Sequence, residues 1–188
     1  MLFAQEENTP FKLNAKGGEL IGEILLGLPA LYIGGVLVVA LLVLMGYADQ
    51  KGASIFIFLV AFLATAVGFY NWLVLNSPLA MAQVLLFAFT YWILGYSWYT
   101  GAKDNRTLGW YCLFVAINVI PFAYYVWDAG MYILGVNWVL WGLAWFMFWV
   151  VMGIQKTQFM KLTLIITWIA AIVVWFCALG WLLGWFGF

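Results

Sequence analysis

The chain alternates long apolar runs with short polar stretches, a pattern that predicts membrane-spanning helices. A bilayer core about 30 Å thick is crossed by about 20 apolar residues in a helix. Six runs reach that length: 24–47, 54–75, 79–99, 108–127, 131–154 and 162–186. The stretches between them are short and carry turn residues, as in neighbouring antiparallel helices. We therefore expect an all-α membrane protein: a six-helix transmembrane bundle in residues 24–188 after a polar N-terminal tail in residues 1–23.

The distribution of positive charge predicts the orientation of this bundle. The loops after the first, third and fifth spans hold five basic residues: Lys51, Lys103, Arg106, Lys156 and Lys161. The other two loops hold none, and the tail holds only Lys12 and Lys16. Because basic loops stay on the cytoplasmic side, we expect a multi-pass protein of the cytoplasmic (inner) membrane with both termini on the extracytoplasmic side.

Composition narrows the possible functions further. The chain is 68% hydrophobic and 7% charged with a net charge of zero, so it suits a lipid bilayer and offers no basic surface to nucleic acid. It contains no histidine, and none of the expected spans contains a charged residue. Histidine-ligated metals, charged proton relays and a nucleophile–base pair are therefore not expected. We predict neither an enzyme nor a cofactor.

The fifth span carries an unusual stripe of tryptophans in the sequence "NWVLWGLAWFMFW" (137–149). Trp138, Trp141, Trp145 and Trp149 fall within about 80° of one helix face. The stripe is about 16 Å long, half the hydrocarbon core, so it is too long for an interfacial aromatic belt. Two interpretations remain: helix packing, which Gly142 on another face would suit better, and a flat aromatic slot that admits neutral solutes.

A few weakly polar residues also lie within the spans. Thr90 is in the middle of the third span, and Asn118 precedes Pro121 by three residues in the fourth. Because Pro121 frees a backbone carbonyl, Asn118 could either satisfy a local kink or face a permeation path. Thr163 and Thr167 in the last span are more typical of contacts between helices.

Four local sequences resemble the AmiS/UreI family of bacterial small-amide channels. They are "GLPALYIGGVL" (27–37), "LLFAFTY" (85–91), "GWYCLFVAIN" (109–118) and "NWVLWGLAW" (137–145), in the order of that family. The similarity extends over roughly residues 25–186. It implies a ring-shaped homo-oligomer of six protomers, each with both termini outside and with its own pore for urea or short aliphatic amides.

The resemblance also implies which residues line the pore. They are Ala30, Ile33 and Leu37 in the first span, Phe89 and Ile93 in the third, Trp138, Trp141, Ala144 and Trp145 in the fifth, and Ile169 in the last. Ile93 stands where the acid-gated urea channel has a tyrosine and Ala144 where it has a leucine, which suggests a roomier, greasier constriction. Ile169 stands where that channel has a buried glutamate. We therefore expect no pH gating.

These observations predict a passive channel for urea or short aliphatic amides, working as a homo-hexamer in the lipid bilayer without a cofactor. Two alternatives stay open from the sequence. One is a channel for another small neutral solute, such as ammonia or water. The other is a non-transporting membrane scaffold subunit whose aromatic stripe contacts a partner.

Overall fold

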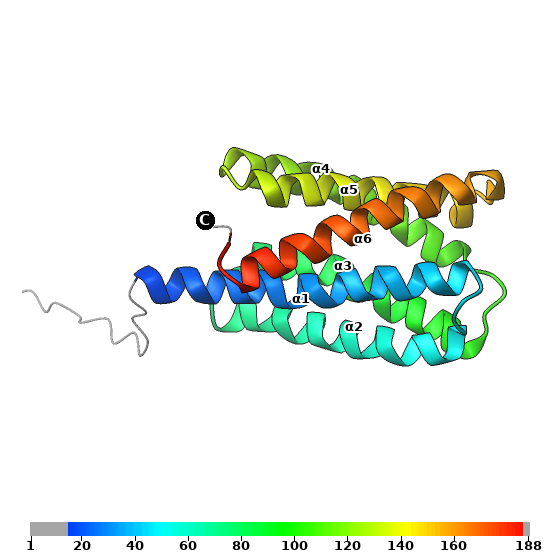
Figure 1. Ribbon diagram of the computed structural model, residues 1–188, viewed down its shortest axis with the longest axis horizontal. Coiled ribbons are helices and arrows are strands. Elements are labelled where there is room, and N and C mark those ends of the chain that lie inside the picture. The colour runs from blue at the N-terminus through cyan, green and yellow to red at the C-terminus, as the bar shows by residue number, and fades with distance from the viewer. Residues whose placement is uncertain (1–14, 186–188) are drawn as a thin grey trace, which may run out of the picture.

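The computed structural model describes residues 15–185, and the side chains from residue 27 onward. Its helices are α1 (Ala15–Leu44), α2 (Gln50–Leu73), α3 (Pro78–Thr100), α4 (Arg106–Asp128), α5 (Tyr132–Phe148) and α6 (Met160–Leu182). A π-helical turn, η1 (Trp149–Gly153), and a 3-10 turn, η2 (Thr157–Phe159), join α5 to α6. Within residues 15–185, six segments are long and apolar enough to cross a membrane, so the predicted all-α, six-span fold is confirmed (Figure 1).

The start of α1 differs from the expected domain division. The helix begins at Ala15, within the stretch 1–23 that was expected to be a polar tail, while residues 1–14 lie outside the described part of the chain. The division at residue 23 therefore stays a prediction. The expected fifth span corresponds to α5 and η1 together.

Turn residues define where helices begin and end. Asp49 caps α2, since its carboxylate accepts a hydrogen bond from the Gly52 amide at 2.6 Å. Ser77 caps α3 just before Pro78. Gly101 ends α3 with φ of 67°, a left-handed conformation that glycine adopts without strain. These caps explain why the connections can be short.

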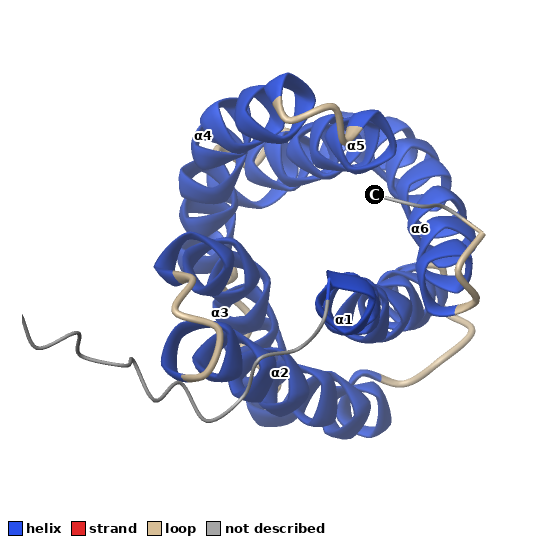
Figure 2. Cartoon of the chain, turned by 90° about the vertical axis from the view of Figure 1, so that its left-hand side faces the viewer, coloured by secondary structure: helices blue, strands red, loops and turns tan. Residues whose placement is uncertain are grey.

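The helices pack in pairs around the bundle axis. The closest pairings are α2 with α3, α1 with α6, and α4 with α5. In the end-on view the helices follow one another around the axis, and α6 returns beside α1 (Figure 2). Glycines allow the close approach of α5 and α4: a Cβ on Gly142 would lie 2.8 Å from Val119, and one on Gly135 would lie 2.7 Å from Trp127.

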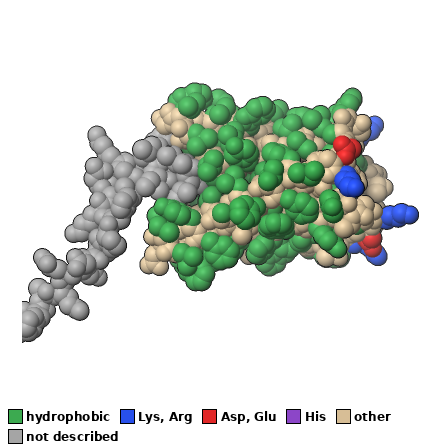
Figure 3. Space-filling model, turned by 90° about the horizontal axis from the view of Figure 1, so that it is seen from below, with side chains coloured by type: hydrophobic (Ala, Val, Ile, Leu, Met, Phe, Trp, Pro, Cys, Tyr) green, Lys and Arg blue, Asp and Glu red, His purple; other side chains and the backbone are tan. Residues whose placement is uncertain are grey.

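The two ends of the bundle differ in charge. The α1–α2, α3–α4 and α5–α6 connections lie at one end, which we call the charged end (Figure 1). In the space-filling view the blue and red side chains gather there, while the sides of the bundle are green and apolar (Figure 3). The opposite end holds the α2–α3 and α4–α5 turns and the last residues of α6.

Candidate functional site

The bundle encloses a cavity of about 220 Å³. A single buried water needs only about 10–15 Å³ by a comparable measure, so the cavity can hold a small organic molecule. Its wall is built by α1, α3, α5 and η1, with contributions from the first residues of α2, α4 and α6 and from Thr167. No Asp, Glu, Lys or Arg side chain is among the residues that line it.

One wall of the cavity is an aromatic cluster that joins α3 to α5. The ring of Phe87 lies edge-on to Trp141 and Trp145, with centroids 4.8 Å and 4.7 Å apart. It also contacts Trp138 at 5.5 Å, and Trp138 meets Trp141 at 5.3 Å. Edge-to-face contacts of this kind fix ring orientation. Trp138, Trp141 and Trp145 therefore face the interior of the bundle, while the glycine face of α5 packs on α4.

The four tryptophans of the stripe have different surroundings. Trp141 and Trp145 line the cavity, whereas Trp138 is buried between Phe87 and Phe122 and lies outside the lining. Trp149 belongs to the π-helical turn, in which Ile154 bonds back to the Trp149 carbonyl five residues earlier. This wider turn ends the α-helical register, and the Trp149 ring packs on Trp110 and Phe146.

Several buried hydrogen-bond donors in this region indicate that the cavity accommodates a polar solute. The indole N–H groups of Trp138 and Trp141 and the hydroxyl of Tyr91 are buried with no hydrogen-bond partner among the described residues. Leaving such a group unpaired costs about 1–3 kcal/mol. Trp141 and Tyr91 are both among the residues that line the cavity, so these donors lie beside the space that a solute would occupy.

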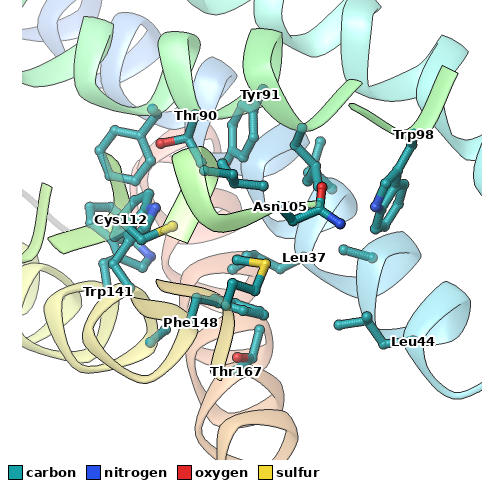
Figure 4. Close-up of a pocket in the computed structure, with 18 of the residues that line it drawn as sticks. Leu37, Leu44, Thr90, Tyr91, Trp98, Asn105, Cys112, Trp141, Phe148 and Thr167 are labelled. Carbon is teal, nitrogen blue, oxygen red and sulfur yellow. The ribbon is translucent and has the colours of Figure 1, made fainter. Parts of the chain in front are cut away.

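Two threonines on the cavity wall complement these donors as acceptors. The hydroxyl of Thr90 donates to the Leu86 carbonyl at 2.8 Å, and that of Thr167 donates to the Thr163 carbonyl at 2.7 Å. Each hydroxyl proton is thereby used within its own helix, and the oxygen keeps free lone pairs. Thr167 was expected to hold helices together, and the structure places it in the cavity wall instead. Figure 4 shows both threonines among the lining side chains.

The structure corrects two expected pore positions. Phe89 and Ile169 lie on the outer surface, 47% and 48% exposed, and neither lines the cavity. The side chains that line it stand two residues earlier, at Phe87 and Thr167. Two residues turn a helix by about 200°, so a register error of two moves a side chain from the interior to the lipid-facing side.

The same two-residue difference between expected and observed lining positions applies to Ile93. Its side chain packs against the buried core but does not line the cavity. Tyr91 does, at the same four-residue spacing from Phe87 that separates Ile93 from Phe89. The cavity wall of this protein therefore contains a tyrosine, two residues before Ile93.

The other expected positions fall into two groups. Ile33, Leu37, Ala144, Trp141, Trp145 and Thr90 line the cavity together. Ala30 is buried but outside the lining, and the amide of Asn118 donates to its own helix at the Phe114 carbonyl, 2.8 Å away. Asn118 thus satisfies the local backbone beside Pro121 and does not reach the cavity.

Some lining residues were not predicted from the sequence. They include Tyr91, Trp98, Asn105 and Cys112, which lie on α3, in the α3–α4 loop and on α4. Tyr91 ends the sequence "LLFAFTY" (85–91), and its four-residue spacing from Phe87 was the one signal that could have revealed it.

A neutral cavity inside six membrane-spanning helices is the architecture of a multi-pass membrane transport protein, and comparison with known proteins gives the family. The chain belongs to the AmiS/UreI family, since it matches the AmiS/UreI family transporters over residues 25–185. It resembles the cryo-EM structure of the Helicobacter pylori urea channel in a closed state, with a TM-score of 0.73 and 29% identity over 85% of this chain and 97% of that one. A crystal structure of the Helicobacter pylori urea channel matches with a TM-score of 0.69 and 27% identity, covering 82% and 96% of the two chains.

Two sequence relatives are named as transporters. An amidate substrates transporter protein of Mycolicibacterium smegmatis is 31% identical over 135 residues, which cover 68% of this chain and 62% of that protein. The transporter protein AmiS2 of Rhodococcus erythropolis is 28% identical over 138 residues, which cover 71% of this chain and 66% of that protein. The matched stretch thus spans a little under two thirds of each relative's own length.

Proposed function

We propose that this protein is a passive channel for urea and short aliphatic amides, with one path through the cavity of each protomer. The observation that carries the proposal is the neutral, aromatic wall of the cavity, in which the Trp141 and Tyr91 donors lack partners. A carbonyl oxygen accepts from these donors, and a solute N–H group donates to the Thr90 or Thr167 oxygen. Because these groups replace hydrogen bonds that the solute makes to water, the free-energy cost of its entry into the cavity stays low.

The same wall explains ion exclusion. A hydrated ion that entered between Phe87, Trp141 and Trp145 would lose water without gaining a counter-charge, since no charged side chain lines the cavity. The cost of such desolvation is prohibitive. A small neutral amide loses only a few hydrogen bonds and regains some of them.

The comparisons favour this solute class. The solved structures of similar fold are urea channels, and the named sequence relatives are transporters, one of them for amidate substrates.

Trp138 lies outside the lining of the cavity, so it does not contact the solute along the open part of the proposed path. With Phe122 and Phe87 against it, Trp138 would close the path toward the end opposite the charged end and would have to move during permeation.

The proposed channel is not gated by pH. The chain contains no histidine, and both α6 residues that line the cavity, Met160 and Thr167, are uncharged. We further propose that the charged end faces the cytoplasm, in line with its basic loops, so that the end opposite it faces outward. The inner membrane and a ring of six protomers complete the proposal.

Stopped-flow light scattering on proteoliposomes tests this function. We expect entry of urea and acetamide to be several-fold faster than in protein-free liposomes, with no increase in sodium or chloride flux. Faster entry of water or ammonia alone would replace the proposal with a channel for those solutes. No acceleration of any solute would favour a non-transporting membrane subunit.

A further inference from the structure

Asn105 stands at the start of α4, yet its side chain does not cap that helix. It occupies the N-cap position without a side-chain capping bond, in contrast to Asp49 at the start of α2. The backbone amide of Arg106, the first residue of the helix, bonds to the carboxylate of Asp104, 3.0 Å away. Asparagine at an N-cap commonly accepts a hydrogen bond from a backbone amide of its helix. The side chain of Asn105 makes no such bond, so it can interact elsewhere.

A hydrogen bond from the neighbouring helix, α3, fixes the orientation of the Asn105 side chain. Ser97 on α3 donates its hydroxyl proton to Oδ1 of Asn105, so the carbonyl half of the amide is engaged. No described residue accepts from the amide nitrogen, and Asn105 lines the cavity. In Figure 4 this nitrogen points toward the part of the cavity where Trp98 and Leu44 are labelled. The hydrogen bond from Ser97 thus aims two N–H donors at the cavity.

A second polar residue lines the same cavity deeper in the bundle. Tyr91 is 2% exposed, and its buried hydroxyl has no partner in the described part of the chain. Six residues separate Tyr91 from Ser97 on α3, which corresponds to about 9 Å along the helix axis. The polar groups of the wall are therefore spaced along the cavity, with Asn105 near the charged end.

We propose that Asn105, oriented by Ser97, is a second recognition point that binds the carbonyl oxygen of the solute near the charged end of the cavity. This inference rests on the proposed channel function and deepens it. The aromatic cluster discriminates solutes by their size and planarity, while the Asn105 amide selects solutes that carry a hydrogen-bond acceptor. A solute that leaves Trp141 and Tyr91 finds a donor again before it meets bulk water.

The substitution Asn105→Asp tests this role with almost no change in shape. The carboxylate keeps the acceptor for Ser97 and suits a helix N-terminus, but it replaces the cavity-facing donor by an acceptor. At neutral pH we expect the flux of acetamide and urea at low concentration to fall about five-fold, the effect of one lost hydrogen bond. Ser97→Ala leaves the donor but frees its orientation, so it should cause a smaller loss in the same direction.

Acid rescue separates recognition from a structural role. Because the helix N-terminus and Ser97 favour the charged form, the new carboxyl is protonated only in part as the pH falls toward 3, which restores an O–H donor. The flux of the Asn105→Asp variant should therefore recover in part at this pH, while that of the unmodified protein stays constant. Asn76→Asp in the α2–α3 turn controls for the added charge at the opposite end and should change neither property.

The outcomes distinguish the two proposals. If the unmodified protein does not accelerate acetamide entry, the channel function itself is wrong. If it does, and the Asn105→Asp protein conducts equally well or shows a loss that acid does not reverse even in part, the recognition role of Asn105 is overturned. Size-exclusion profiles of both variants in detergent confirm that equal amounts of assembled protein are compared.

Discussion

Phe87 of α3 lies edge-on to Trp141 of α5, with ring centroids 4.8 Å apart and ring planes at 81°. Both side chains are buried, and both line the cavity. The contact links α3 to α5 in the part of the cavity wall where the Trp141 donor and flat aromatic surfaces lie together. Much of the proposed selectivity therefore depends on this pair.

The indole N–H of Trp141 can be removed without removing the aromatic ring. In Trp141→Phe the contact with Phe87 persists, but the cavity loses a donor that has no other partner. We expect acetamide and urea flux to fall about two- to ten-fold, as for the loss of one hydrogen bond. The measurement is solute-driven swelling of proteoliposomes. Trp149→Phe, the same change in the π-helical turn and away from the cavity lining, is the matched control and should conduct normally.

Phe87 and Phe89 offer a direct test of which face of α3 lines the path. Phe87→Ala opens the cavity beside three tryptophans, so we expect the flux of butyramide relative to acetamide to rise several-fold. Phe89→Ala changes the outer surface of the protomer and should leave that ratio unchanged. Phe87→Leu provides a milder enlargement if the alanine variant assembles poorly. A larger effect at Phe89 than at Phe87 would contradict the assigned register.

The inward face of α3 could not be predicted from the sequence, in contrast to the number of spans. The six spans followed from length and hydropathy alone, because lipid requires long apolar helices with satisfied backbones. The inward face of α3 did not, since a membrane helix is apolar toward both lipid and core, and the pattern that orients a helix in water is absent. Phe89 and Phe87 are equally apolar in the sequence, and only packing separates them.

The tryptophan stripe was more informative because indoles carry polar N–H groups and keep helices apart. Two of its members, Trp141 and Trp145, are buried and line the cavity. The stripe could not reveal that Trp149 leaves the face of these two residues, because the π-helical turn has no sequence signature comparable to a proline or a cap. Asn105 was missed for another reason: its role depends on Ser97, eight residues earlier, across a loop.

The two cysteines allow the cavity to be probed chemically. Cys112 lines the cavity, whereas Cys177 is buried on α6 outside its lining. We expect a small neutral thiol reagent such as methyl methanethiosulfonate to enter the path, form a methyl disulfide with the Cys112 sulfur with release of methanesulfinate, and reduce acetamide flux several-fold. Cys112→Ser should conduct and resist the reagent, while Cys177→Ser should remain sensitive. Full inhibition of Cys112→Ser would show that the reagent acts at Cys177 and would contradict the assignment of its effect to Cys112.

The pH dependence of flux tests the absence of gating. Among the described residues no acidic side chain lines the cavity, and the sequence has no histidine. The carboxyl nearest to Asn105 in sequence is Asp104, whose pKa is lowered to about 2 by its hydrogen bonds with Arg106. Because a lowered pKa keeps the group charged above that value, this ion pair is lost only as the pH falls toward 2.

We therefore expect urea and acetamide flux to stay constant between pH 5 and 7.5 when the pH is equal on both sides of the vesicle membrane. Asp104→Asn removes the ion pair without adding a titratable group and should show the same flat profile, which makes it the matched control. Several-fold activation of the unmodified protein at pH 5 would require a titrating gate. Persistence of that activation in Asp104→Asn would place such a gate away from the α3–α4 loop.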